Sequence, residues 1–121
     1  DVEVYCCEVS FAKILNHLLP EVTYTPLPKY QSANRDLSIL CDEAVTVAEV
    51  EQVIEANAGK LLRNIKLFDI YRGTGVPEGK KSMAFSLELR ADDRTLTDTD
   101  SEAVISKVLA ALKDQLNATL R

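Results

Sequence analysis

The side chains best suited to bind a ligand lie in the stretch LFDIYRGTGVPEGKKS, residues 67–82. An apolar run there is interrupted by the carboxylate of Asp69 and ends on the phenol of Tyr71. Because strand side chains alternate, these two residues are expected on one face. A carboxylate accepts hydrogen bonds and a phenol ring offers a flat stacking surface, so the pair suits a planar ring with polar edges.

The loop after Tyr71 carries Gly73, Gly75 and Gly79. Its RGTG segment resembles half of a dinucleotide fingerprint, but that fingerprint requires a helix after the loop. Here a second apolar run follows, which is typical of a strand. Pro77-Glu78-Gly79 is ordinary turn chemistry. We therefore interpret the glycines as hairpin flexibility rather than a phosphate-binding loop.

Two helices are predicted from their starting residues. Thr46 and Glu49 form a capping box, and Gly59 is a suitable end for that helix. Thr97 is expected to cap the second helix, with acids in its first turn, where the helix dipole favours anions. Those acids are Asp98 and Asp100.

Alternating apolar residues predict strands over 36–41, 61–71 and 82–89, and LNATLR is expected to form a final short strand. The order is β-α-β-β-α-β, and each helix has one apolar stripe to bury against the sheet. The predicted fold class is α+β, a ferredoxin-like sandwich with an antiparallel sheet and two helices on one face. The other face stays uncovered.

The first 27 residues are expected to form an appendage. Val2 and Val4 alternate with polar positions and predict a strand, and helical spacing from Phe11 to Leu19 predicts a short helix. TYTPLPKYQSA contains two prolines and is interpreted as an extended linker. The compact domain is expected to span residues 28–121, and the chain is expected to be a fragment of a longer protein.

Strand alternation also predicts what the uncovered face displays. Phe68 and Ile70 are expected inside, and the outward positions are Asp36, Ser38, Leu40, Leu67, Asp69, Tyr71, Ser82, Ala84, Ser86 and Glu88. Two interpretations remain open. These residues are either an ordinary solvent-facing surface, or a floor on which a ring stacks against Tyr71 while Asp69, Ser38 and Ser82 bond to its edge.

The charges and cysteines exclude several classes of protein. The net charge of −5 counts against binding nucleic acid by bulk electrostatics alone, although residues 60–94 hold eight basic and five acidic side chains. Three cysteines are a poor disulfide framework, and a single histidine without a Cys-x-x-Cys pair argues against a zinc site. No apolar run approaches the ~18 residues of a membrane span. No set of nucleophile, base and oxyanion donors is evident, so we expect no catalytic residue.

Several blocks in the compact unit resemble one family. They are Arg35-Asp36-Leu37, Leu67-Phe68-Asp69-x-Tyr71, Pro77-Glu78-Gly79-x-Lys81-Ser82 and Arg94-Thr95-Leu96-Thr97-Asp98. In this order and spacing they resemble the C-terminal ferredoxin-fold anticodon-binding domain of bacterial-type phenylalanyl-tRNA synthetase β subunits. The resemblance covers residues 24–121 and implies that residues 1–27 are the tail of the preceding β-subunit module and a linker.

The resemblance implies a role for each candidate residue. Ser38, Asp69, Tyr71 and Ser82 would bind the tRNA(Phe) anticodon, with a base stacked on Tyr71 and a guanine edge bonded to Asp69. The cations expected at the RNA backbone are Arg35, Arg72, Lys80 and Lys81.

The resemblance also implies features of the whole enzyme. It would be a cytoplasmic (αβ)₂ ligase that uses ATP and Mg²⁺ and pairs with an α subunit, with no cofactor in this domain and no DNA or membrane partner. The alternative hypothesis is a ferredoxin-like regulatory module that pairs sheets edge to edge and binds an amino acid at a dimer interface.

Overall fold

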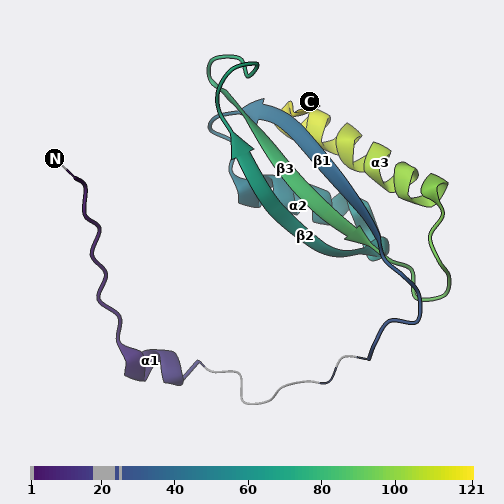
Figure 1. Ribbon diagram of the computed structural model, residues 1–121, viewed down its shortest axis with the longest axis horizontal. Helices are drawn as coiled ribbons and strands as arrows, with labels where there is room; N and C mark the ends of the chain where they lie inside the picture. Colours follow the sequence, from purple (N-terminus) through teal and green to yellow (C-terminus); the bar gives the residue numbers. More distant parts are fainter. Residues whose placement is uncertain (1, 18–23, 25) are drawn as a thin grey trace.

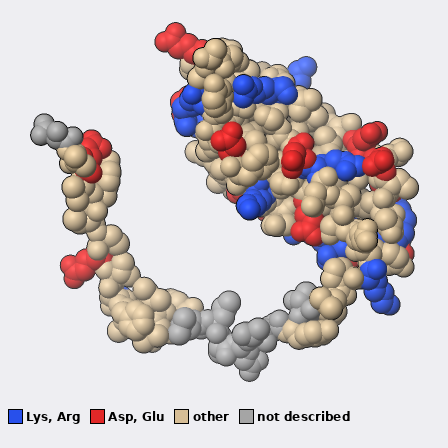
Figure 2. Space-filling view, viewed as in Figure 1, with Lys and Arg blue, Asp and Glu red and all other residues tan. Residues whose placement is uncertain are grey.

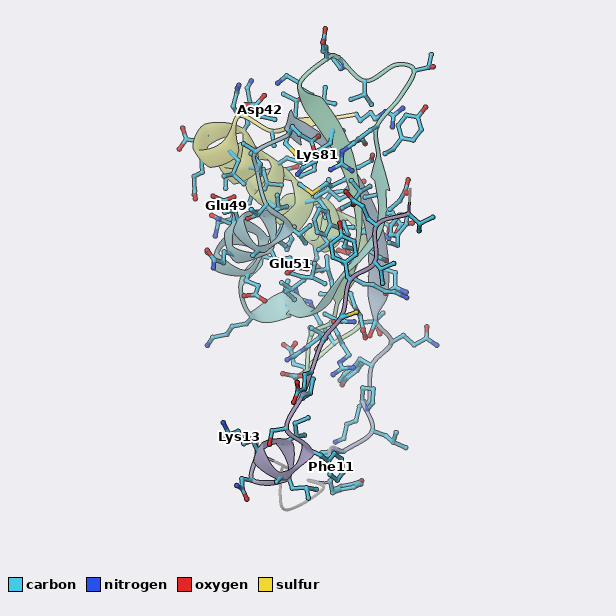
Figure 3. All side chains as sticks on the ribbon, turned by 90° about the vertical axis from the view of Figure 1, so that its left-hand side faces the viewer. Phe11, Lys13, Asp42, Glu49, Glu51 and Lys81 are labelled. Atoms are coloured by element: carbon cyan, nitrogen blue, oxygen red, sulfur yellow. The ribbon has the colours of Figure 1, made fainter. Side chains whose placement is uncertain are left out.

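A single antiparallel sheet forms the centre of the domain. The computed structural model describes residues 2–17, 24 and 26–121 (Figure 1). The strands are β1 (Ala33–Asp42), β2 (Leu62–Tyr71), β3 (Lys80–Leu89) and β4 (Thr119–Leu120), arranged in the order β2-β3-β1-β4. Helices α2 (Val47–Ala58) and α3 (Asp98–Leu116) lie on one side of this sheet (Figures 1 and 3). The predicted ferredoxin-like α+β fold is confirmed.

Both helices begin at the predicted caps. The Glu49 carboxylate accepts the Thr46 backbone N–H at 2.8 Å, and the Thr46 side chain accepts the Glu49 N–H, which completes the predicted capping box. Thr97 and Asp100 form a second box in the same way. At the other ends, Gly59 follows α2 with φ +69°, and Asn117 ends α3 in the left-handed conformation. These termini satisfy backbone groups that a helix leaves unpaired.

The core fills the space between the sheet and the two helices. Fully buried side chains come from both layers: Leu37, Ile39, Met83, Phe85 and Leu87 from the strands, and Val50, Ile54, Val108 and Leu112 from the helices. Cys41 is buried among them, and desolvation raises the pKa of its thiol. Because α2 and α3 cover only this side, no helix among the described residues packs on the opposite face of the sheet.

Strand β2 departs from the predicted alternation. Leu67 pairs with Phe85 and Asp69 pairs with Ala84, so Phe68 is an extra residue in a β-bulge. Residues opposite each other in a ladder share a face, so Leu67 lies on the core side with Phe85. Phe68 is 54% exposed. The predictions that Leu67 faces outward and Phe68 inward were therefore wrong, because a bulge resets the alternation by one residue.

The same bulge leaves the end of β2 in the predicted orientation. Ile70 pairs with the buried Met83, while Asp69 and Tyr71 pair with Ala84 and Ser82 on the uncovered face. A second irregularity occurs at Arg63, between the pairs of Leu62 and Asn64.

The amino-terminal segment is less regular than predicted. Residues 2–10 form no strand, and the helix is α1 (Phe11–Leu15). The strand prediction was wrong, because an alternating sequence becomes a strand only beside a partner with which its backbone can bond. The predicted helix is shorter than expected, because Asn16 and His17 form a turn, and its last two positions, Leu18 and Leu19, lie outside the described residues.

Candidate nucleic-acid interface

The four predicted ring-binding residues lie in two adjacent rows of the uncovered face. In one row Ala84 stands between Asp69 of β2 and Ser38 of β1. In the next, Ser82 stands between Tyr71 of β2 and Leu40 of β1. The hydroxyl oxygens of Ser38 and Ser82 lie 3.3 Å apart. The structure thus brings Ser38, Asp69, Tyr71 and Ser82 together around one patch.

Tyr71 is fixed at its backbone by the sheet and at its hydroxyl by the loop that follows β2. Its backbone belongs to the β2–β3 ladder, and its hydroxyl donates to the Thr74 carbonyl at 3.3 Å. A Cβ at Gly73 would lie only 2.8 Å from that hydroxyl oxygen, so the ring passes directly over this glycine. Gly73 is therefore small for a steric reason, which the interpretation of the glycines as flexible turn residues missed.

Arg121 covers one face of the Tyr71 ring. Its guanidinium carbon lies 5.0 Å from the ring centroid, which is a cation–π geometry. The Arg121 backbone N–H donates to the Ser38 carbonyl at 3.0 Å, and this bond fixes the root of the side chain beside the patch. Sequence reasoning missed Arg121. The sequence did predict a final short strand that includes Arg121, but it did not indicate the strand with which this one pairs.

Ser82 is enclosed although no helix covers this face. Only 3% of its surface is exposed, and its ladder neighbours Tyr71 and Leu40 flank it. Tyr71 itself is 38% exposed. In this conformation a ligand therefore reaches Tyr71 and Asp69 before it reaches Ser82.

The predicted backbone cations fall into two groups. Arg72 and Lys80 lie at the loop end of the sheet, where Arg72 binds the Glu43 carboxylate through Nε at 2.9 Å and Nη2 at 2.6 Å. This hydrogen bonding lowers the pKa of Glu43 and raises that of Arg72. Lys80 pairs with Asp42 at 3.0 Å. Both pairs are exposed to solvent, so each is weakly held.

Arg35 and Lys81 lie on the helix side of the sheet. Arg35 is opposite Leu87 and binds Asp98 at the start of α3. Lys81 is opposite Cys41, is 8% exposed, and donates to the Glu43 carbonyl at 2.8 Å (Figure 3). These contacts tie strand ends to neighbouring elements and place both cations away from the patch around Tyr71.

The charge on the uncovered face is mixed. Figure 2 shows the molecule from this side, with basic and acidic side chains interspersed. Within the described residues, no cluster of His, Cys, Asp and Glu is arranged to hold a metal ion. No helix in the described part of the chain is long and apolar enough to cross a membrane. The patch therefore offers an aromatic ring, a carboxylate and hydroxyls rather than a uniformly basic surface.

Comparison with known protein families identifies the family of this domain. Residues 28–121 match the model of the ferredoxin-fold anticodon binding domain. The chain belongs to this family, which confirms the resemblance seen in the sequence.

Proteins similar to this chain over nearly its whole length are phenylalanine–tRNA ligase beta subunits. The phenylalanine–tRNA ligase beta subunit of Bacillus licheniformis is 40% identical over 119 residues, 98% of this chain. The proteins of the same name from Clostridium tetani and Symbiobacterium thermophilum are 38% and 41% identical over 100% and 98% of this chain. The chain spans only 13–15% of the length of these relatives.

Proposed function

We propose that this domain binds the anticodon of tRNA(Phe) on its uncovered sheet face. The observation that carries the proposal is the pair Asp69 and Tyr71, which lie at the end of β2 opposite Ala84 and Ser82, on the face that α2 and α3 leave uncovered. One anticodon base stacks on the Tyr71 ring, as aromatic platforms do in single-stranded RNA recognition. Asp69 accepts hydrogen bonds from the edge of a base, and guanine offers the N–H groups that such a carboxylate requires.

The serines line the floor beside this base. Ser38 is half-buried and its hydroxyl is 3.3 Å from that of Ser82, so the two form a small polar spot between β1 and β3. Because Ser82 is enclosed in the free domain, its hydroxyl meets a base only when the side chains around it shift.

Arg72 and Lys80 are the cations that meet the RNA backbone in this proposal. Each is paired with an exposed acid, Glu43 or Asp42. Because an exposed ion pair contributes little free energy, either cation can leave its acid for a phosphate at small cost. We leave Arg35 and Lys81 out of the contact surface because both lie on the helix side. With a net charge of −5, the 121-residue chain is expected to bind RNA weakly and in a salt-sensitive way.

The role of the whole protein is part of the same proposal. Similarity to phenylalanine–tRNA ligase beta subunits supports a cytoplasmic ligase in which this domain positions tRNA. An α subunit in an (αβ)₂ assembly would carry out the reaction with ATP and Mg²⁺, and this domain would contribute binding alone. Residues 1–27 would then be the tail of the preceding β-subunit module and a linker.

Titration of the tRNA(Phe) anticodon stem-loop into the chain tests the proposal. Tyr71→Ala should weaken binding by about 1–3 kcal/mol, the contribution of one stacked base. Tyr5→Ala is the matched control, because Tyr5 is exposed and lies in the amino-terminal segment. Equal binding of a stem-loop with another tRNA's anticodon, or NMR shifts that avoid the uncovered face, would contradict the proposal.

The alternative of an amino-acid-binding dimer has weaker support. It requires sheets that pair edge to edge, and β2 is the edge strand with the longer run. The irregularities at Arg63 and Phe68 interrupt the spacing of its ladder, and bulges of this kind discourage edge pairing. A monomeric mass, with no thermal stabilisation by amino acids, would rule out this alternative.

A further inference from the structure

We propose that Arg121 forms the second wall of the base site, so that the base is held between the Tyr71 ring and the Arg121 guanidinium. This inference rests on the proposed function and adds a residue to it. Its starting point is the position of the guanidinium over the ring, 5.0 Å from the centroid. The pair marks where a flat ligand enters.

The 5.0 Å between the Arg121 guanidinium and the Tyr71 ring is too small to admit a base and too large for tight stacking of the two groups on each other. A base between two flat groups requires about two stacking distances, roughly 7 Å. The guanidinium therefore moves outward by about 2 Å from its 5.0 Å position to admit the base. In the free domain Arg121 closes over Tyr71, and in the complex it closes over the base.

The surroundings of Arg121 allow this movement. Its backbone is fixed by the bond to the Ser38 carbonyl, while its side chain is exposed. Across the part of the chain that the structure describes, no carboxylate forms an ion pair with it, in contrast to Arg35 and Arg72. A side chain with a fixed root and an unpaired head can open and close without breaking an ion pair.

The Arg121 guanidinium also lies near the loop that follows β2. The nearest atom to a Cβ built at Gly75 is an Arg121 guanidinium nitrogen, at 3.9 Å. The guanidinium therefore lies close to the same loop that holds the Tyr71 hydroxyl through Thr74. Both walls belong to one small region, although Tyr71 comes from the middle of the chain and Arg121 from its end.

The chemistry of arginine suits this role better than that of lysine. A guanidinium is planar and weakly hydrated and stacks on aromatic faces, whereas an ammonium is a compact, strongly hydrated point charge. A base wall thus requires the planar group. A contact with a phosphate would need only the positive charge, so Arg121→Lys separates the two roles.

The experiment uses the 121-residue chain and anticodon stem-loops with 2-aminopurine at one anticodon position at a time. The fluorescence of this base falls when it stacks, and the chain contains no tryptophan to interfere. Arg121→Ala should weaken binding about 5- to 20-fold and raise the fluorescence of the bound probe only part of the way to that of the free probe, because one face of the base still stacks on Tyr71. Arg121→Lys should recover less than half of that loss. Circular dichroism verifies that both variants fold.

The outcomes distinguish this inference from the proposed function. Full binding by Arg121→Lys, or a change confined to the salt dependence, would show a phosphate contact and overturn the base wall. If Arg121→Ala binds as the parent does while Tyr71→Ala binds more weakly, the role of Arg121 is overturned and the proposal of anticodon binding stands. Absence of binding by the unmodified chain would overturn the proposed function and this inference together.

Discussion

The close approach of Gly73 to the Tyr71 hydroxyl gives a quantitative test of the loop. A Cβ at residue 73 would lie 2.8 Å from that oxygen and 3.1 Å from the ring carbon that bears it. Ordinary contact begins at 3.4 Å, so the hydroxyl in Gly73→Ala has to retreat by at least about 0.6 Å. Its hydrogen bond to Thr74 is already 3.3 Å long and should be lost.

The energy of this loss can be estimated. A hydrogen bond contributes about 0.5–1.5 kcal/mol to stability. Gly→Ala at a position without left-handed backbone gains about 0.4–1 kcal/mol through the unfolded chain. Gly73→Ala should therefore lower the free energy of unfolding by about 1 kcal/mol or less. In a Tyr71→Phe background the bond is already absent and only the 3.1 Å contact with the ring carbon remains, so the same change should cost less stability than in the parent.

A double-mutant cycle measures the difference directly. Urea unfolding of the parent, the two single variants and the double variant should give a coupling energy of about 1 kcal/mol between positions 71 and 73. In thermal melts a difference of this size corresponds to about 4–8 °C for a domain of this length. The same effect of Gly73→Ala in both backgrounds would refute the hydroxyl contact as the reason for this glycine.

Two further predictions concern stability. Phe85→Ala should lower the free energy of unfolding by about 3–5 kcal/mol, because Phe85 is fully buried. Phe68→Ala, at the exposed bulge, should cost below about 1 kcal/mol in the same urea titration, and similar losses would contradict the assignment of the bulge. Glu49→Gln keeps the capping-box geometry but removes the carboxylate, whose pKa is lowered by the Thr46 backbone N–H. That carboxylate stabilises the fold above its ordinary pKa of 4.5, and the contribution is lost as the pH falls through the lowered value. Below pH 4.5 the variant should therefore lose stability less steeply than the parent, and parallel curves would argue against this.

The elements with local signals were predictable from the sequence. The capping boxes at Thr46 and Thr97 depend on residues three positions apart, so the helix starts needed no knowledge of the tertiary structure. The end of α2 at Gly59 is of the same kind. These signals, together with the order of the strands, were sufficient for the fold class and the uncovered face.

The details that depend on distant partners were not predictable. A bulge at Phe68 exists only relative to the register with β3, and simple alternation placed Leu67 on the wrong side. Arg121 could not be assigned to the patch because its position follows from the pairing of β4 with β1. These strands are neighbours in the sheet but lie at opposite ends of the domain's sequence. The strand expected near Val2 and Val4 is absent from residues 2–10 for a related reason: alternation alone does not provide a pairing partner.

Strand β4 has a consequence for the dynamics of the domain. It is two residues long and pairs with β1 only at Ile39 and Leu40, so it can fray at far lower cost than the core can unfold. Fraying would break the bond between Arg121 and Ser38 and carry the guanidinium away from Tyr71 while the helices stay packed. The exposure of the Tyr71 ring is thus coupled to local opening of β4, in addition to the movement of the Arg121 side chain on its own.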